Sequence, residues 1–243
     1  MYVDNLVLET TRRCNMQCEH CLRGESQRLS MNREILYDFF SQVEYIGTIT
    51  FSGGEPSLPS GIKVMEDVLQ ICGMKGVEVS NFYIATNGKY FRKNFCETVM
   101  KWYYFCDDNE ISSVDVSNDQ YHEENSSVFY QMEEWFLYNH GYEDIVHQRM
   151  ERGRDMPSVI AQGRASNWGD KKQSPTTFMV TGESITEGAI YLNCKGNIIR
   201  GCDFSYKSQD TPENILCKAK DFSSFITNKL NTVEEFGEEG IEI

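Results

Sequence analysis

The chain has 243 residues, 40% of them hydrophobic, which is enough for one sizeable core with a short appendage but crowded for two full domains. The formal net charge of -14 disfavours nucleic acid and anionic membranes as partners, because both are polyanions, whereas a small or amine-bearing substrate is easily accommodated. We find neither a membrane-spanning stretch nor the layout of a secretion signal, so we expect a cytoplasmic location. Nine cysteines, an odd number, indicate reduced thiols or metal ligation rather than a disulfide framework.

Strand and helix patterns alternate along the first 150 residues. The segments that predict strands, with the turns that end them, are residues 3–9, 47–56, 77–88, 111–119 and 142–150. The segments with helical spacing of apolar residues are 30–46, 58–74, 91–105 and 126–141. Ser30 or Asn32 is expected to cap the first helix, and Pro59 lies near the start of the second. Because each crossover between parallel strands needs a dozen or more residues, the alternation predicts an α/β fold, a partial (β/α)6 TIM-like barrel.

The regular pattern weakens beyond residue 150. The features predicted there are a hairpin over residues 188–206 that turns at 195–197, a helix near residues 220–236, and a frayed acidic tail over residues 237–243. We therefore expect a barrel core over residues 1–186 and a hairpin and helix extension over residues 187–243 that completes or covers the barrel.

Three cysteines, Cys14, Cys18 and Cys21, lie close together in the segment TRRCNMQCEHCLRG directly after the first predicted strand. A structural zinc site normally takes four ligands from two C-x2-C pairs, and the sequence has no second such pair. His20 would have to fold back between two of the thiols to complete a tetrahedron. Three thiolates instead suit an iron–sulfur cube whose fourth iron stays open for a ligand that is not protein. A non-catalytic, cysteine-rich metal-binding module is the alternative.

The spacing Cys14-x3-Cys18-x2-Cys21, placed just after the first strand, resembles the signature of radical S-adenosylmethionine (radical SAM) enzymes. The resemblance implies that the three thiolates hold a [4Fe-4S] cluster. It also implies that the backbone at His20 faces the adenine of S-adenosylmethionine. Motifs that support the resemblance extend over about the first 165 residues of the chain.

A second segment, Gly53-Gly54-Glu55-Pro56, resembles the GGEP motif of the same family. In that family the exposed backbone and the glutamate hold the methionine amino group. The chemistry agrees, because glycines let a backbone approach a ligand closely and Glu55 supplies an acceptor for an ammonium. By itself the segment would be interpreted as an ordinary turn. Its occurrence together with the cysteine motif supports the resemblance to the family.

Further family-like positions follow the later strands. Asn87 belongs to a TNG segment, and Ser117 and Asp119 end the fourth predicted strand, where family members often bind the ribose hydroxyls. For Ser117 and Asp119, turn residues without a ligand are the alternative. Arg164, in the segment QGRA, and Arg149, at the end of the fifth predicted strand, compete for the methionine carboxylate, and Arg164 could instead support the barrel.

The resemblance implies a concrete reaction. The reduced cluster would cleave S-adenosylmethionine to methionine and a 5′-deoxyadenosyl radical, which would abstract hydrogen from a substrate at the barrel mouth. A reducing electron donor of the flavodoxin or ferredoxin type would supply the electron. The protein's part is to position the reacting atoms and to exclude solvent.

The substrate is less sharply indicated. Candidate contacts are Tyr121 and His122 after the fourth strand, His147 on the fifth, and Asp203 and Tyr206 after the hairpin, although each could simply complete a structural hydrogen bond. No closely spaced thiols follow residue 21, so we expect no auxiliary cluster. A small molecule is therefore favoured, and within the family the layout most resembles queuine lyase, which recovers a 7-deazaguanine base. A radical SAM peptide-modifying enzyme is the alternative.

Overall fold

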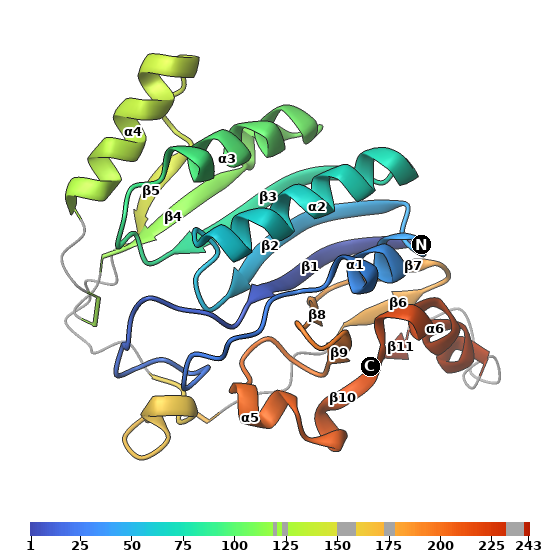
Figure 1. Ribbon diagram of the computed structural model, residues 1–243. Coiled ribbons are helices and arrows are strands. Elements are labelled where there is room, and N and C mark those ends of the chain that lie inside the picture. Colours follow the sequence, from blue (N-terminus) through green and yellow to red (C-terminus); the bar gives the residue numbers. More distant parts are fainter. Residues whose placement is uncertain (119–120, 123–125, 150–158, 173–177, 232–240) are drawn as a thin grey trace.

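The computed structural model describes residues 1–118, 121–122, 126–149, 159–172, 178–231 and 241–243. In these residues one curved sheet carries helices on one side, and the C-terminal segments lie below its first strand in the view of Figure 1. No helix in this part of the chain is both long and apolar enough to cross a membrane.

Five parallel strands form one half of the sheet, in the order β1-β2-β3-β4-β5. Their bounds are β1 Tyr2–Thr11, β2 Tyr45–Gly53, β3 Glu78–Thr86, β4 Ser113–Ser117 and β5 Val146–Arg149. The helices between them are α1 Arg33–Phe40, α2 Pro59–Lys75, α3 Lys93–Phe105 and α4 Ser126–His140, with a short 3-10 helix, Asn109–Ile111, before β4. The predicted alternation and the parallel sheet are confirmed.

Local sequence signals fix the ends of the helices. Asn32 is the N-cap of α1, and its side chain accepts a hydrogen bond of 2.9 Å from the backbone N–H of Glu34. Ser30, the other candidate, instead shares a 3.0 Å hydroxyl contact with Thr11 at the end of β1. Pro59 opens α2, where its missing N–H costs nothing, and Gly76 ends that helix in the left-handed conformation at φ 70°.

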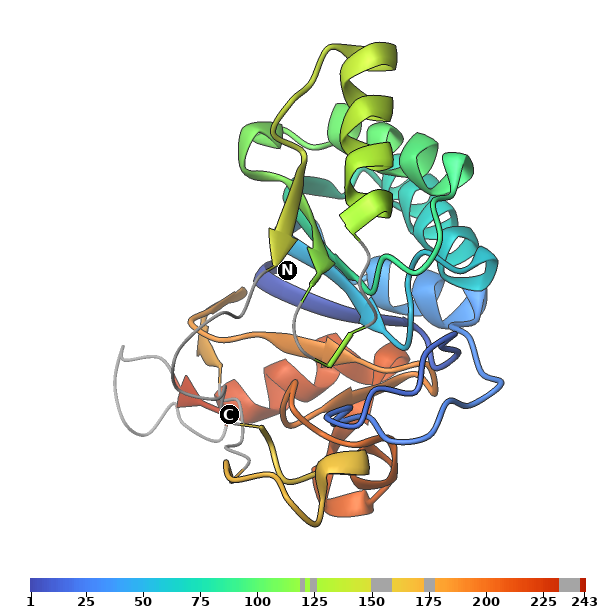
Figure 2. The same cartoon turned by 90° about the vertical axis from the view of Figure 1, so that its left-hand side faces the viewer.

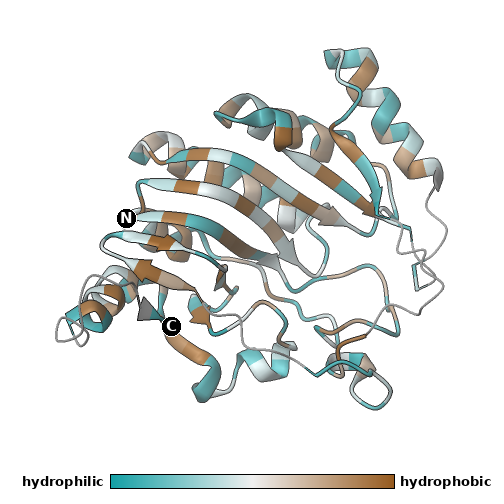
Figure 3. Ribbon diagram, turned by 180° about the vertical axis from the view of Figure 1, so that it is seen from behind, coloured by the Kyte–Doolittle hydropathy of each residue, from teal (hydrophilic) through white to brown (hydrophobic). Residues whose placement is uncertain are grey.

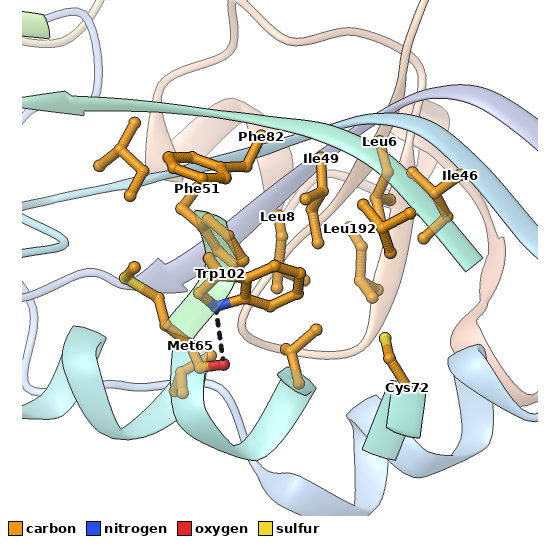
Figure 4. Close-up of a cluster of buried hydrophobic side chains, with 14 of the residues drawn as sticks. Leu6, Leu8, Ile46, Ile49, Phe51, Met65, Cys72, Phe82, Trp102 and Leu192 are labelled. Atoms are coloured by element: carbon orange, nitrogen blue, oxygen red, sulfur yellow. Dashed lines mark hydrogen bonds between the residues drawn. The ribbon is translucent and has the colours of Figure 1, made fainter. Parts of the chain in front are cut away.

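The hydrophobic core lies between the sheet and the helices α1 to α3. Alternate residues of the central strands, among them Leu8 and Phe51, point to this side and are fully buried. Trp102 of α3 packs edge-to-face on Phe51, with 4.9 Å between the ring centroids (Figure 4). Its indole N–H donates to the carbonyl of Met65 in α2 at 3.2 Å, so this large side chain is buried without an unsatisfied donor.

The face of the sheet opposite the helices, called the inner face here, is much more polar. Strand register places Thr50, Tyr83, Asp115 and His147 there, because each alternates with core-facing neighbours. The Tyr83 hydroxyl donates to Asp115 at 2.9 Å, and His147 lies 3.8 Å from the same carboxylate. Alternating hydrophilic and hydrophobic bands along the strands are visible in Figure 3. The inner face can therefore meet a polar ligand.

The C-terminal segments extend the sheet on the other side of β1 (Figure 2). Their strands are β6 Met179–Thr181, β7 Ser184–Thr186, β8 Ile190–Leu192, β9 Asn197–Ile199, β10 Ile215–Lys218 and β11 Ile241–Glu242, and their helices are α5 Tyr206–Gln209 and α6 Phe222–Asn231. The predicted hairpin is confirmed: β8 and β9 are antiparallel and turn through Gly196 at φ 72°. The helix predicted near residues 220–236 corresponds to α6, and residues 232–236 of that prediction lie outside the described residues.

The very end of the chain is better ordered than the sequence suggests. The expectation of a frayed tail is wrong for Ile241 and Glu242, which pair with β6 as the short strand β11. Two backbone hydrogen bonds between Ile243 and Phe178, of 3.0 and 3.3 Å, close this ladder. The expected domain boundary after residue 186 falls between β7 and β8, which both pair with β1, and it stays a prediction.

Candidate functional site

The cysteine loop, residues 12–27, leaves the end of β1 and folds back on itself. The backbone N–H of Gln27 donates to the carbonyl of Arg12 at 2.9 Å and closes the loop at its base. Within it, the N–H of Cys14 donates to the Ser26 hydroxyl at 2.9 Å, and the N–H of Cys21 donates to the Cys18 carbonyl at 3.2 Å. The three thiols are free and half-buried.

The thiols of Cys14, Cys18 and Cys21 line one pocket of about 310 Å³, a volume that includes its opening to solvent. The other residues of its lining are Arg12, Met16, Arg23, Gly24, Ser26, Gly53, Gly54, Arg164 and Tyr206. No group of three His, Cys, Asp or Glu residues in the described part of the chain is arranged to hold a single metal ion. An iron–sulfur cluster makes a different demand, because it binds each thiolate through a different iron.

The pocket does not favour free thiolates. Burial, together with like-charge repulsion from the neighbouring Cys14 and Cys21, raises the pKa of Cys18 to about 11. Burial also raises the pKa of Cys14, against a lowering by the backbone N–H of Met16. Both groups are therefore neutral thiols at pH 7 in the free protein. A metal centre would have to displace their protons, as thiolate ligation of metals always requires.

Gly53 and Gly54 form the wall where the end of β2 meets the cysteine loop. A Cβ on Gly53 would lie 2.2 Å from the carbonyl oxygen of Thr11, and one on Gly54 would lie 2.2 Å from that of Arg13. The Gly54 N–H donates to the same Thr11 carbonyl at 2.6 Å. Both glycines thus allow the backbone of β2 to approach the backbone of the loop, and both also line the pocket.

Glu55 is 1% exposed and is tied to the protein by three donors. Its carboxylate accepts hydrogen bonds from the Ser57 N–H at 2.9 Å, the Thr86 hydroxyl at 2.6 Å and the Asn87 N–H at 2.8 Å. A carboxylate has about four acceptor positions, so about one remains for an external ammonium. The predicted contact of Glu55 with the methionine amino group stays a prediction. The observed role is to join the glycine turn to the end of β3.

The other strand ends are placed as follows. The amide of Asn87 donates to Asn15 at 2.9 Å and lies 3.7 Å from the sulfur of Cys14, so it belongs to the rim of the cysteine site. Ser117 is half-buried at the end of β4 and pairs with Arg149 in the ladder. Asp119 lies outside the described residues. The roles predicted for these residues remain predictions.

The two competing arginines lie in different places. Arg164 lines the pocket, donates to the Cys18 carbonyl at 3.3 Å, and makes a bidentate pair with Glu25 at 2.9 and 3.2 Å. Its backbone N–H donates to the Cys21 carbonyl at 3.0 Å. Arg149 lies on the inner face, where it lowers the pKa of Tyr83, which burial and Asp115 nevertheless raise to about 12. Of these two candidates, Arg164 and not Arg149 lies at the cysteine site.

Gly163 lets the backbone of the QGRA segment pack closely against the cysteine loop, and its substitution tests this contact. Its φ is 58°, and a Cβ there would lie 2.4 Å from the carbonyl oxygens of both Cys21 and Leu22. Gly163→Ala is expected to lower the free energy of unfolding by about 2–4 kcal/mol, from left-handed strain plus backbone overlap, and to reduce iron uptake. Chemical denaturation and iron quantification measure these two effects.

The chain offers a matched control for this variant. Gly182 has the same φ of 58°, but nothing lies within 4 Å of the position that its Cβ would take. Gly182→Ala is expected to cost only about 1–2 kcal/mol and to leave iron uptake unchanged. Equal losses in the two variants would mean that the contact between residue 163 and the cysteine loop carries no energy.

Three of the predicted aromatic and histidine candidates lie together. The His20 ring stacks on Tyr121, with 4.5 Å between centroids, and meets His122 edge-on at 5.1 Å. His147 lies apart from them, half-exposed on β5 beside Asp115. Asp203 is half-buried after the hairpin, and Tyr206 lines the cysteine pocket itself. The structure therefore groups Cys14, Cys18 and Cys21 with Tyr206 and groups the His20 ring with residues that follow β4.

Sequence reasoning missed a group of charged residues behind the pocket. Arg12 and Glu9 are both fully buried and form an ion pair of 2.7 Å. Arg23 also lines the pocket, donates to the Phe204 carbonyl at 2.6 Å, and lies over the ring of Tyr191 at 4.8 Å. The available sequence signal was the adjacent pair of arginines directly before Cys14, at the end of a predicted buried strand.

Comparisons with known proteins agree on the fold. No protein-family model matches the chain, and no similar curated protein was found. Among solved structures it resembles native anSMEcpe with bound AdoMet and Kp18Cys peptide, at a TM-score of 0.57 and 13% identity, over 97% of this chain and 83% of that one. It also resembles the same enzyme with Cp18Cys peptide, at a TM-score of 0.55, 11% identity and coverages of 97% and 82%.

A further match is BtrN in an open conformation, at a TM-score of 0.50 and 13% identity, over 98% of this chain and 86% of that one. The chain thus has the partial TIM-like α/β fold of radical SAM enzymes, as the sequence predicted. At this level of identity the likeness concerns the fold, and function has to be argued from the site. These matches lend no support to a queuine substrate, which stays a prediction.

Proposed function

We propose that this protein is a radical SAM enzyme in which Cys14, Cys18 and Cys21 hold a [4Fe-4S] cluster. The observation that carries the proposal is the sharing of one pocket by three free, half-buried thiols at the carboxyl end of β1. Active sites of β/α barrels gather at this end of the strands. When bound, the cluster and S-adenosylmethionine supply a one-electron reductive cleavage that leads to hydrogen abstraction from a substrate.

The residues around the pocket fit such a group. Three thiol donors suit iron, and a cluster with its ligands is anionic, while the residues that line the pocket include the cationic Arg12, Arg23 and Arg164. Outer-shell cations and hydrogen bonds of this kind stabilise a negatively charged centre. The glycine wall keeps that side of the pocket free of side chains, so a ligand can meet the backbone there.

The chain's own residues would do three things for the reaction. Arg164 would hold the cysteine loop through the Cys18 carbonyl, as it does in the free protein. Glu55 would offer its remaining acceptor position to the ammonium of S-adenosylmethionine. Asn87, 3.7 Å from the Cys14 sulfur, would orient one cluster ligand. Ser117, Asp119 and the stacked His20 are the candidates for the nucleoside.

For the substrate we infer a peptide in preference to queuine. The supporting observation is that two of the matched structures hold a peptide together with AdoMet. The inner face agrees with it, because Tyr83, Asp115 and His147 offer hydrogen-bonding groups along neighbouring strands to an extended, polar ligand. The acidic balance of the chain favours a peptide that carries positive charge.

Anaerobic reconstitution tests the class of protein. We expect about four irons and four sulfides per chain and, after addition of S-adenosylmethionine and a strong reductant, release of 5′-deoxyadenosine. A colourless protein with one bound zinc and no such release would identify the metal-binding module instead. A flavodoxin or ferredoxin can replace the chemical reductant in a second series.

The same assay distinguishes the substrates. Peptides with basic residues, free amino acids and queuine are each added, and 5′-deoxyadenosine is compared with the uncoupled background. We expect the stimulation with peptides, and mass spectrometry of the peptide should show a change of mass. Stimulation by queuine alone would restore the lyase hypothesis and overturn the peptide assignment.

A further inference from the structure

Tyr206 is the lining residue of the cysteine pocket that comes from the C-terminal segments. The residue begins α5, and its backbone N–H donates to the carbonyl of Arg23 in the cysteine loop at 3.0 Å. The guanidinium of Arg12 lies 4.6 Å from the centre of its ring. Next to it, the N–H of Ser205 donates to the side chain of Gln162 at 2.7 Å. Backbone and ring are therefore fixed from three directions.

The hydroxyl of this well-fixed side chain has no hydrogen-bond partner among the described residues. Tyr206 is 3% exposed, so the hydroxyl is not hydrated as a surface group would be. Buried hydroxyls are almost always paired, because an unsatisfied one loses the free energy of its contact with water. Because Tyr206 belongs to the residues that line the pocket and its phenol lies near the Cys21 thiol, an unsatisfied hydroxyl here indicates a partner that the pocket receives from outside.

The chemistry of the lining narrows that partner. The polar and sulfur-bearing side chains among the other lining residues are those of three arginines, which only donate, the three cysteines, Met16 and Ser26. Burial raises the pKa of Tyr206, and Glu9 raises it further, so the phenol remains a neutral donor. A neutral phenol can donate its proton to an acceptor, and the sulfurs of a cluster held by the three cysteines would be acceptors at this place.

We propose that Tyr206 is a positioning residue that donates a hydrogen bond to a sulfur of the cluster on Cys14, Cys18 and Cys21 and so raises the reduction potential of the cluster. The inference rests on the proposed function, since it needs the cluster. Its physical reason is that reduction adds negative charge to the sulfurs, and a hydrogen-bond donor stabilises the more negative form.

Tyr206→Phe tests the proposal, because it removes the hydroxyl and keeps the ring. Tyr191→Phe is the matched control: Tyr191 is also fully buried, but its hydroxyl donates to Glu9 at 2.9 Å and does not line the pocket. The midpoint potential of each reconstituted protein is measured by a redox titration followed by electron paramagnetic resonance. The denaturation midpoint of each iron-free protein is measured in parallel.

The expected results are opposite for the two variants. Tyr206→Phe should shift the midpoint potential in the negative direction. It should leave the iron-free protein as stable as wild type, or more stable, because the hydroxyl makes no hydrogen bond to the described part of the chain that the substitution would remove. Tyr191→Phe should lower the stability of the iron-free protein, because its hydroxyl is paired, and leave the potential unchanged. Reduced iron uptake by a folded Tyr206→Phe protein also supports the contact.

Two results would overturn the inference. The first is an unchanged potential in Tyr206→Phe; if binding of S-adenosylmethionine is weaker at the same time, the hydroxyl belongs to the nucleoside. The second is a loss of stability in iron-free Tyr206→Phe as large as that in Tyr191→Phe, which would mean that the hydroxyl has a partner in the protein. Failure of the wild-type protein to take up iron would instead refute the proposed function itself.

Discussion

Cys18→Ala is expected to abolish the reductive cleavage of S-adenosylmethionine. Among the described residues three thiols line the pocket, so the variant would leave a cluster with two protein ligands. Loss of an outer-shell partner already lowers activity or metal affinity by up to roughly 100-fold, and loss of a direct ligand should exceed that. Release of 5′-deoxyadenosine and iron content per chain, both after anaerobic reconstitution, measure the effect.

The variant should remain folded. Cys18 is half-buried in a loop outside the core and forms no disulfide, so its truncation should change the free energy of unfolding by no more than about 0.5–1 kcal/mol. Cys217→Ala is the matched control, because Cys217 is also free and half-buried but lies on β10, outside the pocket lining. It should keep both iron and activity.

Two outcomes would contradict this assignment in different ways. A Cys18→Ala protein with wild-type iron content and activity would exclude Cys18 as a ligand. Equal loss of iron in Cys217→Ala would mean that C-terminal cysteines also bind iron, and the expectation of no auxiliary cluster would be wrong. In that case the total should exceed the roughly four irons per chain of a single cluster.

The sequence was sufficient where the signal is local. Three thiols within eight residues stay close together in any fold, so the sequence alone predicts that Cys14, Cys18 and Cys21 lie near one another, while their role as cluster ligands stays a prediction. The same holds for Asn32, whose capping partner is two residues away, and for Gly196, whose turn joins adjacent strands. The alternation of strand and helix over the first 150 residues is also a local pattern, and it predicted the parallel sheet correctly.

The partners of the site could not be predicted in this way. Tyr206 reaches the pocket only because the hairpin of β8 and β9 lies beside β1, and that pairing joins residues more than 180 apart in the chain. Nothing near Arg164 in the sequence indicates its bonds to Cys18 and Glu25, which are 146 and 139 positions away. Contacts of this range depend on topology, which single-sequence patterns do not encode.

The glycine turn shows that one sequence motif can have more than one physical cause. The sequence interpretation was that Gly53 and Gly54 let a ligand approach the backbone. In the structure their missing side chains make room first for the carbonyl oxygens of Thr11 and Arg13. The close approach that glycine permits is thus already used to pack two protein segments. The pocket-facing side of the same turn is what remains for a ligand.

Arg12→Met is expected to lower the free energy of unfolding of the iron-free protein by about 3–5 kcal/mol. Arg12 and Glu9 are fully buried, and the guanidinium also donates to Gln209 at 2.8 Å and to Gln27 at 3.1 Å. The methionine would leave the Glu9 carboxylate buried without its counter-charge. Because Gln209 belongs to α5, the variant should also loosen the C-terminal segment from β1. Chemical denaturation measures the loss.

Arg13→Met is the control, since Arg13 is the next residue and is exposed, and its variant should stay within about 0.5 kcal/mol of wild type. The double variant Glu9→Gln/Arg12→Met removes both charges and should recover part of the loss, because a neutral amide keeps the hydrogen-bonding shape that Tyr191 and Cys194 offer to Glu9. If the double variant is less stable than Arg12→Met alone, the loss comes from packing around the methionine. Recovery would instead assign it to the uncompensated carboxylate.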